Sequence, residues 1–189
     1  MTTQTDTSLA AAAPLSSTGR RVLSVALGAL LVALAAQVRI PLPFTPVPVT
    51  LQDLAVLAVG GLLGPALGTA ALVTYLTAGL LGLPVFAGGG AGLAWLLGPT
   101  GGYLLAFPVA AFVMGTLARR GGFVLAVAGA LAGMVVIHLG GMAQLAVLTG
   151  DPATAFALGS LPFLPVSALK IGLAAALVVG LSSRFRGLR

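Results

Sequence analysis

A single lysine, Lys170, interrupts an apolar segment near the C-terminus that otherwise has the composition of a membrane helix. A charged side chain at the centre of such a helix costs roughly 2.5–3.5 kcal/mol on insertion scales, so it normally has a partner or a purpose. Three explanations are open: the ammonium group binds an anionic ligand, it pairs with Asp53 or Asp151, or the side chain extends to the membrane surface. We favour an anionic ligand, because Lys170 lies about ten residues, or about 15 Å, inside the segment.

A second pair of polar residues, Gln52 and Asp53, begins another apolar segment after the proline-rich stretch Arg39–Thr50. A carboxamide both donates and accepts hydrogen bonds, so Gln52 suits a ligand with a urea or amide group. For Asp53 we consider helix capping the better explanation, and Thr50 is the other candidate for that cap. The prolines make their stretch stiff, either as part of a binding mouth or as a rigid linker.

The segment 83–103, LPVFAGGGAGLAWLLGPTGGY, combines glycine with aromatic residues. It lacks the Gly-Lys-Ser/Thr ending of a phosphate-binding loop, so we expect no nucleotide site. We interpret it as a flexible lid in which Phe86, Gly90 and Trp95 cover an outward-facing pocket. The alternative for Trp95 is a place in the aromatic belt at the membrane surface.

Two tyrosines and the only histidine lie within other apolar segments, at Tyr75, Tyr103 and His138. Each tyrosine offers a hydroxyl group and an apolar face to a ligand. We interpret His138 as a packed, hydrogen-bonded residue, with a place in the pocket wall as the alternative. One histidine, three acidic residues and no cysteine do not make a metal site, and no nucleophile stands beside a base. We therefore expect neither a metal nor a cofactor, and no enzyme.

These residues must be positioned by membrane helices, because the composition does not suit a surface in water. Of the 189 residues, 59% are hydrophobic and only 6% are charged, whereas soluble domains have about 25% charged residues. The apolar runs are continuous rather than alternating, which favours helices in lipid over a β-barrel. The formal charge of +6 does not indicate nucleic-acid binding, because the basic residues are dispersed and mostly flank apolar runs.

Glycine, proline and charged residues divide the chain into six apolar segments, each of which we expect to be a membrane helix. The segments are Val22–Val38, Val47–Leu63, Ala66–Leu83, Pro99–Ala118, Phe123–Leu148 and Leu161–Leu181. A span needs about 20 residues, so only the short second segment is doubtful, and a re-entrant segment is its alternative. Residues 1–19 are expected to form a disordered cytoplasmic tail, and residues 20–189 a single membrane domain.

The arginines favour six crossings with both termini in the cytoplasm, where positive residues concentrate. With six spans, most of the basic residues lie on one side of the membrane. They are Arg20, Arg21, Arg119, Arg120, Arg184, Arg186 and Arg189. The longer connections, residues 39–50, 84–98 and 149–160, then face outward, whereas the cytoplasmic turns are short. We therefore expect a ligand-binding mouth on the outer side.

Three stretches together resemble the BioY family, the biotin-specific substrate-binding components of energy-coupling-factor (ECF) vitamin importers. They are IPLPFTPVPVTLQDLAVLAVGGLLGP, GLPVFAGGGAGLAWLLGPTGGYLLAFP and LPFLPVSALK. The resemblance implies an all-α fold of six transmembrane helices in the bacterial plasma membrane, with a biotin pocket under the outer loops. It also implies a transmembrane coupling protein and two ATP-binding subunits, which alone use ATP. The expected function is high-affinity capture of extracellular biotin, and the alternative is a self-sufficient facilitator or channel for small organic anions.

The resemblance also implies roles for single residues. Lys170 resembles the partner of the biotin carboxylate, Gln52 a ligand-contacting position and Tyr75 a residue of the pocket wall. Ala29 and Ala33, four residues apart in the first span, resemble the surface that docks on the coupling protein. Packing within the chain explains the same spacing of small residues equally well.

The chain departs from the family pattern at Ser167, where the family has an aspartate three residues before the lysine. Serine removes a negative neighbour of Lys170, one helical turn away. A contact to the ureido group of biotin is then in doubt, although serine can still form a weaker hydrogen bond. The family tends to have a neutral residue where this chain has Asp53, so Asp53 is a candidate for part of that role.

Overall fold

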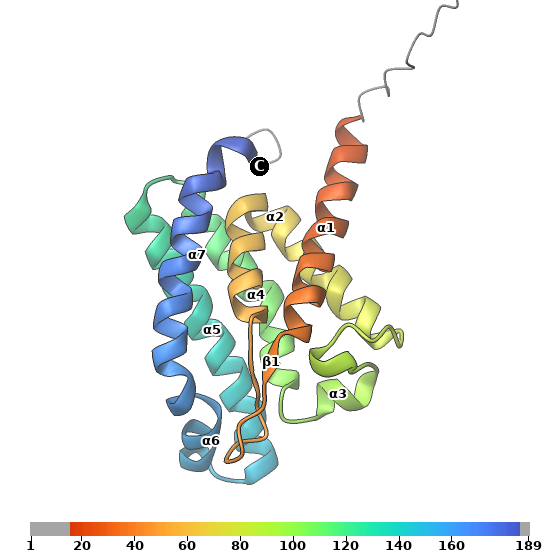
Figure 1. Cartoon of the computed structure of the whole chain (residues 1–189), viewed down its shortest axis with the longest axis vertical. Helices are drawn as coiled ribbons and strands as arrows, with labels where there is room; N and C mark the ends of the chain where they lie inside the picture. Colours follow the sequence, from red (N-terminus) through yellow and green to blue (C-terminus); the bar gives the residue numbers. More distant parts are fainter. Residues whose placement is uncertain (1–15, 186–189) are drawn as a thin grey trace, which may run out of the picture.

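The computed structural model describes residues 16–185, which form a bundle of helices with one short antiparallel ribbon (Figure 1). In chain order the elements are α1 (Ser17–Gln37), β1 (Arg39–Ile40), β2 (Val49–Thr50), α2 (Gln52–Leu80), the 3-10 turn η1 (Ala87–Gly89), α3 (Leu93–Leu97), α4 (Gly101–Ala118), α5 (Phe123–Thr149), α6 (Pro152–Gly159), the 3-10 turn η2 (Leu161–Phe163) and α7 (Leu164–Phe185). In the ribbon, Arg39 pairs with Thr50 and Ile40 with Val49.

Helix α2 is a hairpin of two arms rather than one straight helix. Gly64 has φ 81° and ψ 175°, a conformation that favours glycine, and Pro65 begins the second arm. Figure 1 shows the chain running to this turn and back again. The arms touch near the turn, because a side chain on Gly68 would begin 2.8 Å from the Cα atom of Gly60. These arms, residues 52–63 and 65–80, are the second and third expected spans.

The structure resolves the doubt about the second span. Its start is tied to β1 by the pairing of Thr50 with Arg39, at the far end of α1. Its last turn lies beside Arg21, at the beginning of α1. The first arm of α2 therefore crosses the bundle from one end to the other, and the re-entrant alternative is wrong. When α2 counts as one segment, five helical segments of residues 16–185 are long and apolar enough to span a membrane, and its two arms make six.

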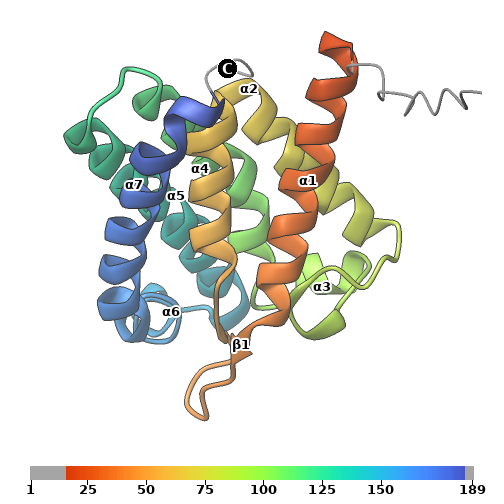
Figure 2. The ribbon, with the colours of Figure 1, turned by 45° about the horizontal axis from the view of Figure 1, so that its top comes forward.

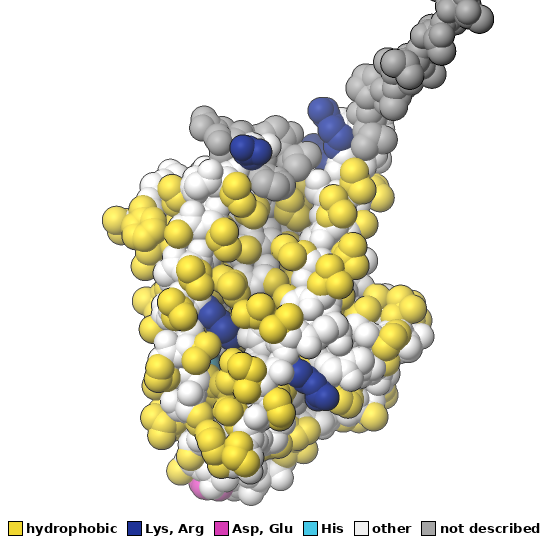
Figure 3. Space-filling view, in the orientation of Figure 1, with side chains coloured by type: hydrophobic (Ala, Val, Ile, Leu, Met, Phe, Trp, Pro, Cys, Tyr) yellow, Lys and Arg dark blue, Asp and Glu magenta, His cyan; other side chains and the backbone are white. Residues whose placement is uncertain are grey.

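The two ends of the bundle differ in their side chains. At one end, which we call the arginine end, Arg21 and Arg119 lie around the turn between Gly64 and Pro65. The other end, the loop end, carries the β1–β2 ribbon, α3 and α6 (Figure 2). Figure 3 shows Lys and Arg side chains at the arginine end of the face that it displays, and others farther toward the loop end. Arg186 and Arg189, part of the expected cytoplasmic set, lie outside the described residues.

Helix boundaries differ from the expected ones at both termini. Ser16 caps α1, because its hydroxyl oxygen accepts a hydrogen bond from the Gly19 amide at 3.0 Å. Residues 17–19, which we expected in the disordered tail, are therefore the first helical residues of α1, and residues 1–15 lie outside the described chain. The long connections at the loop end also contain short helices, α3 and α6, which hydropathy alone does not indicate.

Helices α2 and α4 form the centre of the bundle, and α1 lies at its edge. Helix α1 is the least buried of the five apolar segments. Its open face consists of large apolar residues, among them Leu23, Leu27 and Leu34. Ala29 and Ala33 are instead half-buried and pack against the chain's own core. Packing within the chain, the other explanation of their spacing, is therefore present, and the docking role of Ala29 and Ala33 stays a prediction.

Candidate functional site

A cavity opens at the loop end, where the β1–β2 ribbon meets α2, α4, α5 and α7. It measures about 620 Å³ when the open space at its mouth is included, and its wall is largely apolar with a few polar side chains, as in small-molecule sites. Seven of the ten candidate residues line it: Gln52, Asp53, Trp95, Tyr103, His138, Ser167 and Lys170. Sequence reasoning missed the rest of the wall, namely Val47, Pro48, Val49, Thr50, Ala87, Thr100, Leu104, Phe107, Ile137 and Phe163.

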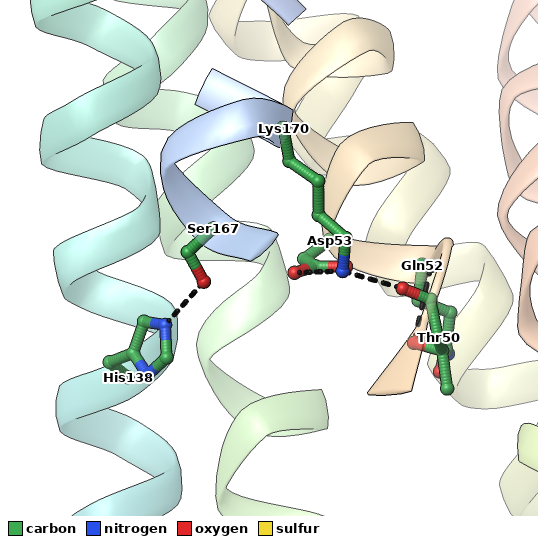
Figure 4. Close-up of polar contacts among 6 residues, drawn as sticks. All are labelled: Thr50, Gln52, Asp53, His138, Ser167 and Lys170. Carbon is green, nitrogen blue, oxygen red and sulfur yellow. Dashed lines mark hydrogen bonds and ion pairs between the residues drawn. The ribbon is translucent and has the colours of Figure 1, made fainter. Parts of the chain in front are cut away.

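The Lys170 ammonium group is paired within the chain at the wall of this cavity. Its Nζ lies 2.7 and 2.8 Å from the two carboxylate oxygens of Asp53, and it donates a hydrogen bond to the Thr50 carbonyl oxygen at 2.6 Å (Figure 4). The side chains are only 7% and 17% exposed. The ion pair with Asp53, one of the three explanations considered for the lysine, is therefore present. The ammonium group nevertheless borders open space, because Lys170 and Asp53 both line the cavity.

Asp53 does not cap α2, so the expected cap is wrong. The residue before the helix is Leu51, and no side chain forms a cap bond there. The Asp53 carboxylate turns toward α7 instead, because a buried cation offers it a stronger partner than a neutral backbone amide does. The hydroxyl group of Thr50 accepts a hydrogen bond of 3.3 Å from the Gln52 amide, so the start of α2 is still held locally.

His138 of α5 is hydrogen-bonded through both ring nitrogens, to Ser160 between α6 and η2 and to Ser167 of α7. Nδ1 lies 3.0 Å from the Ser160 hydroxyl, and Nε2 lies 3.0 Å from the Ser167 hydroxyl, the contact drawn in Figure 4. A neutral imidazole donates from one nitrogen and accepts at the other, which suits two hydroxyl partners. Both interpretations of His138 hold, since it is hydrogen-bonded within the helix bundle and also lines the cavity. Ser167 is engaged with His138 and leaves Asp53 as the partner of Lys170.

Trp95 and Tyr103 form the aromatic part of the wall. Trp95, on α3, lies directly over Gly90, where any side chain would overlap the indole ring. Gly90 does not itself line the cavity; its lack of a Cβ atom permits this close approach. The Tyr103 hydroxyl donates a hydrogen bond to the Gly159 carbonyl oxygen. The ring of Tyr103 is thereby held between α4 and the end of α6.

Phe86 and Tyr75 lie behind the wall rather than in it. Phe86 is fully buried, its ring packs edge-to-face on Tyr75 with centroids 5.6 Å apart, and it covers Gly79. The expected lid is therefore wrong for Phe86, which anchors the glycine-rich segment to the core. The Tyr75 hydroxyl accepts a hydrogen bond of 2.6 Å from the Gln52 side chain and donates one of 3.2 Å to the Val85 carbonyl oxygen. Tyr75 thus orients the carboxamide of Gln52 from behind.

A residue that sequence reasoning overlooked, Gln37, holds the same segment from α1. Its Nε2 donates to the carbonyl oxygens of Val85 and Phe86, at 3.5 and 3.3 Å, and its Oε1 accepts from the Gly89 amide at 3.1 Å. A carboxamide in the last turn of an apolar helix was the available signal, because a polar group there needs partners. The contacts join the outermost helix to the segment that carries Trp95.

We expect the Gln37→Met variant to loosen this segment. Loss of the carboxamide leaves the Gly89 amide and the Phe86 carbonyl only the 3.1 Å hydrogen bond that they form with each other, and the loss of the bonds to α1 costs about 0.5–1.5 kcal/mol. Amide hydrogen exchange in residues 85–90 should become about tenfold faster, as measured by mass spectrometry. Gln144→Met is the matched control, because Gln144 binds the carbonyl oxygens of Leu96 and Gly98. Equal exchange in residues 85–90 of wild type and Gln37→Met would contradict the assignment.

The fold and the cavity together define a multi-pass helical membrane protein with a small-molecule site at one end. Comparison with known proteins specifies the class further: the sequence model of the BioY family matches residues 5–187, and the chain belongs to this family. Among its relatives, a probable biotin transporter BioY of Pyrococcus horikoshii is 40% identical over 89% of this chain and 97% of its own length. A biotin transporter BioY of Thermotoga maritima is 38% identical over 75% and 85%.

A solved structure supports the same conclusion. The crystal structure of an S-component for biotin from an ECF-type ABC transporter superposes with a TM-score of 0.81 at 27% identity, over 90% of this chain and 95% of that one. The resemblance read from the sequence is confirmed, as is the six-helix fold. The family consists of transport proteins rather than enzymes, and the chain is a multi-pass protein of the plasma membrane.

Proposed function

We propose that this protein binds biotin in the cavity at the loop end and serves as the substrate-binding subunit of a biotin importer. The observation that carries the proposal is the Lys170 ammonium group, which borders a largely apolar cavity in a member of the BioY family. Biotin carries a carboxylate on an apolar chain and a urea-like ring system. A buried cation, polar side chains and aromatic walls suit these three parts.

In this proposal the carboxylate of biotin binds Lys170. An ammonium group has three N–H donors, and its partners in the chain are the Asp53 carboxylate and the Thr50 carbonyl. A carboxylate that enters the cavity either shares the ammonium group with Asp53 or displaces it. The entering anion must therefore overcome both the existing ion pair and the negative charge of Asp53, and this competition sets the affinity.

The ureido group and the apolar parts of biotin take the remaining walls. Gln52, oriented by Tyr75, offers both a donor and an acceptor to a urea. Phe107, Ile137 and Phe163 line the cavity and offer apolar surface to the thiophane ring and the alkyl chain. Each methylene group transferred from water to such a wall contributes about 0.8 kcal/mol.

We further propose that the loop end faces outward and the arginine end faces the cytoplasm. Arg21 and Arg119 lie together at the arginine end, and such residues concentrate on the cytoplasmic side. The sequence has no nucleotide-binding motif, so energy for uptake comes from a partner. In this proposal a coupling protein and two ATP-binding subunits supply it, and α1, the least buried helix, faces the coupling protein. Biotin uptake in cells that lack any coupling subunit would favour a self-sufficient facilitator instead.

Trp95 provides a direct test of the binding site. It is the only tryptophan of the chain and it lines the cavity, so its fluorescence reports only on this wall. We expect biotin to change the intensity in a saturable titration with one site per chain, measured on purified protein in detergent. Indole fluorescence responds to the dehydration of its surroundings, and a ligand that fills the cavity displaces water from the ring.

The controls separate occupation of the cavity from general quenching. A Trp95→Phe variant should give no signal and should still bind biotin in calorimetry, because phenylalanine retains most of the apolar wall. A small carboxylate without the ring system, such as pentanoate, should leave the fluorescence unchanged at concentrations at which biotin saturates the fluorescence change. A linear, unsaturable response to biotin would contradict binding in this cavity.

A further inference from the structure

We infer that the arginine end holds a second binding site, which takes the phosphate group of an anionic membrane lipid. A separate pocket lies there, about 600 Å³ when the open space at its mouth is included. Its lining combines Arg21 of α1, Arg119 at the end of α4, and residues 63–67 around the turn of α2. Three elements that are distant in sequence thus converge on one pocket, at the opposite end from the cavity assigned to biotin.

The charges of this pocket are not balanced within residues 16–185. The ion pair found in this part of the chain joins Lys170 to Asp53, which line the cavity at the loop end. Asp151, the other acid of the described chain, caps the start of α6, also at the loop end (Figure 2). Two guanidinium groups around one pocket, without a carboxylate of these residues, favour an anionic ligand. A guanidinium group binds two phosphate oxygens at once, which makes arginine especially suitable for phosphate.

The backbone of the turn adds to this preference. Gly64 ends one arm of α2 and Pro65 begins the next, so the first amides of the second arm lack helical partners. The 16 residues 65–80 are helical in the structure, and the positive end of their dipole lies at the pocket. Gly115 of α4 packs directly against the backbone of the turn, which fixes its shape. The turn thus presents a rigid, electropositive floor.

A lipid phosphate fits this position better than a free anion. The lining includes Leu63, Ala66 and Leu67 beside the two arginines, so the anion site continues into apolar surface that suits an acyl chain. The pocket lies at the ends of membrane-spanning helices, where phospholipid headgroups are located. Basic pockets between transmembrane helices on the cytoplasmic side are known to hold anionic headgroups. The inferred lipid would tie the start of α1 to the end of α4 through their arginines.

The test compares two double variants that remove the same charge. Arg21→Gln with Arg119→Gln removes both pocket arginines, whereas Arg20→Gln with Arg120→Gln removes their immediate neighbours, which do not line the pocket. Each protein is reconstituted in phosphatidylcholine vesicles with and without phosphatidylglycerol, extracted gently, and examined by native mass spectrometry. We expect wild type to retain phosphatidylglycerol, the pocket variant to retain about tenfold less, and the neighbour variant to retain nearly as much as wild type.

Three results would overturn the inference. If both double variants lost the same amount of bound phosphatidylglycerol, the overall charge of this end would explain the binding. If the pocket variant retained as much phosphatidylglycerol as wild type, the site would be excluded. Inorganic phosphate, added to protein in phosphatidylcholine alone, tests the other source of the same chemistry. The thermal unfolding midpoint is measured with phosphate and with phosphatidylglycerol. If phosphate stabilised wild type as strongly as phosphatidylglycerol does, and did not stabilise the pocket variant, the site would bind a free anion rather than a lipid. Retained biotin titration of Trp95 fluorescence shows that each variant is folded, independently of the lipid.

Discussion

The Lys170→Met variant is expected to raise the dissociation constant of biotin at least about 100-fold, because it removes the cation that, in the proposed site, binds the carboxylate of biotin. Hydrogen bonds to charged groups contribute about 1.5–3 kcal/mol each, and 2.7 kcal/mol corresponds to a factor of 100. Methionine keeps the apolar length of the lysine stem, so the cavity retains its shape. Isothermal titration calorimetry with biotin and with its uncharged methyl ester measures the effect. The ester should lose much less affinity than biotin does.

The ion pair with Asp53 makes a second variant necessary. Lys170→Met alone leaves the Asp53 carboxylate largely buried without its partner, and breaking a buried pair costs about 3–5 kcal/mol of stability. In the double variant Lys170→Met, Asp53→Asn, no charge remains unpaired, so the protein should unfold near the wild-type temperature. It should still discriminate poorly between biotin and the ester. If both ligands lost affinity equally in the double variant, Lys170 would not contact the carboxylate.

Asp53→Asn alone is expected to strengthen biotin binding about tenfold while it destabilises the empty protein. The Asp53 carboxylate holds Nζ of Lys170 at 2.7 Å and repels an entering carboxylate. Its neutral replacement leaves the ammonium group available to the ligand and removes the repulsion, which at a few ångströms exceeds 1 kcal/mol outside bulk water. The affinity of the methyl ester should stay unchanged. The thermal midpoint of the ligand-free protein should fall, because a charge-assisted hydrogen bond is lost.

Biotin and its methyl ester also distinguish this prediction from the other role considered for Asp53, a contact to the ureido group of biotin. If Asp53 replaced the missing aspartate at position 167 and bound the ureido group, the Asp53→Asn variant would bind biotin and its ester more weakly by the same factor. Asp151→Asn is the matched control, since Asp151 is exposed and its hydrogen bonds stay within residues 149–155. Its neutral replacement should leave the biotin affinity unchanged.

A chain of hydrogen bonds connects the cavity to the outermost helix. Gln52 in the wall binds Tyr75, Tyr75 binds the Val85 carbonyl oxygen, and Gln37 of α1 binds the same carbonyl. Gln52 faces the cavity, and α1 is the least buried of the long apolar segments. A change in the cavity wall therefore has a direct route to α1. The Gln37→Met variant is therefore expected to weaken the connection between the cavity wall and the exposed helix α1.

The sequence by itself determined the membrane class and the charge difference between the two ends, and it favoured the six spans that the structure then settled. Each of these depends on local properties: continuous apolar runs, glycine and proline at the breaks such as Gly64, and arginines beside the runs. Seven of the 17 residues that line the cavity were also identified from the sequence, because polar and aromatic side chains within apolar segments are few. Lys170, Gln52 and His138 stand out for this reason alone.

Only the tertiary structure decided which groups these side chains contact. Lys170 and Asp53 are far apart in sequence, and the ion pair forms because α7 packs beside the start of α2. Phe86 and Trp95 belong to one glycine-rich segment, yet the first is buried against Tyr75 and the second borders the cavity. Ala29 and Ala33 face inward because α1 presents that side to the core. Pairing and burial depend on how distant helices pack, and hydropathy along the chain does not contain that information.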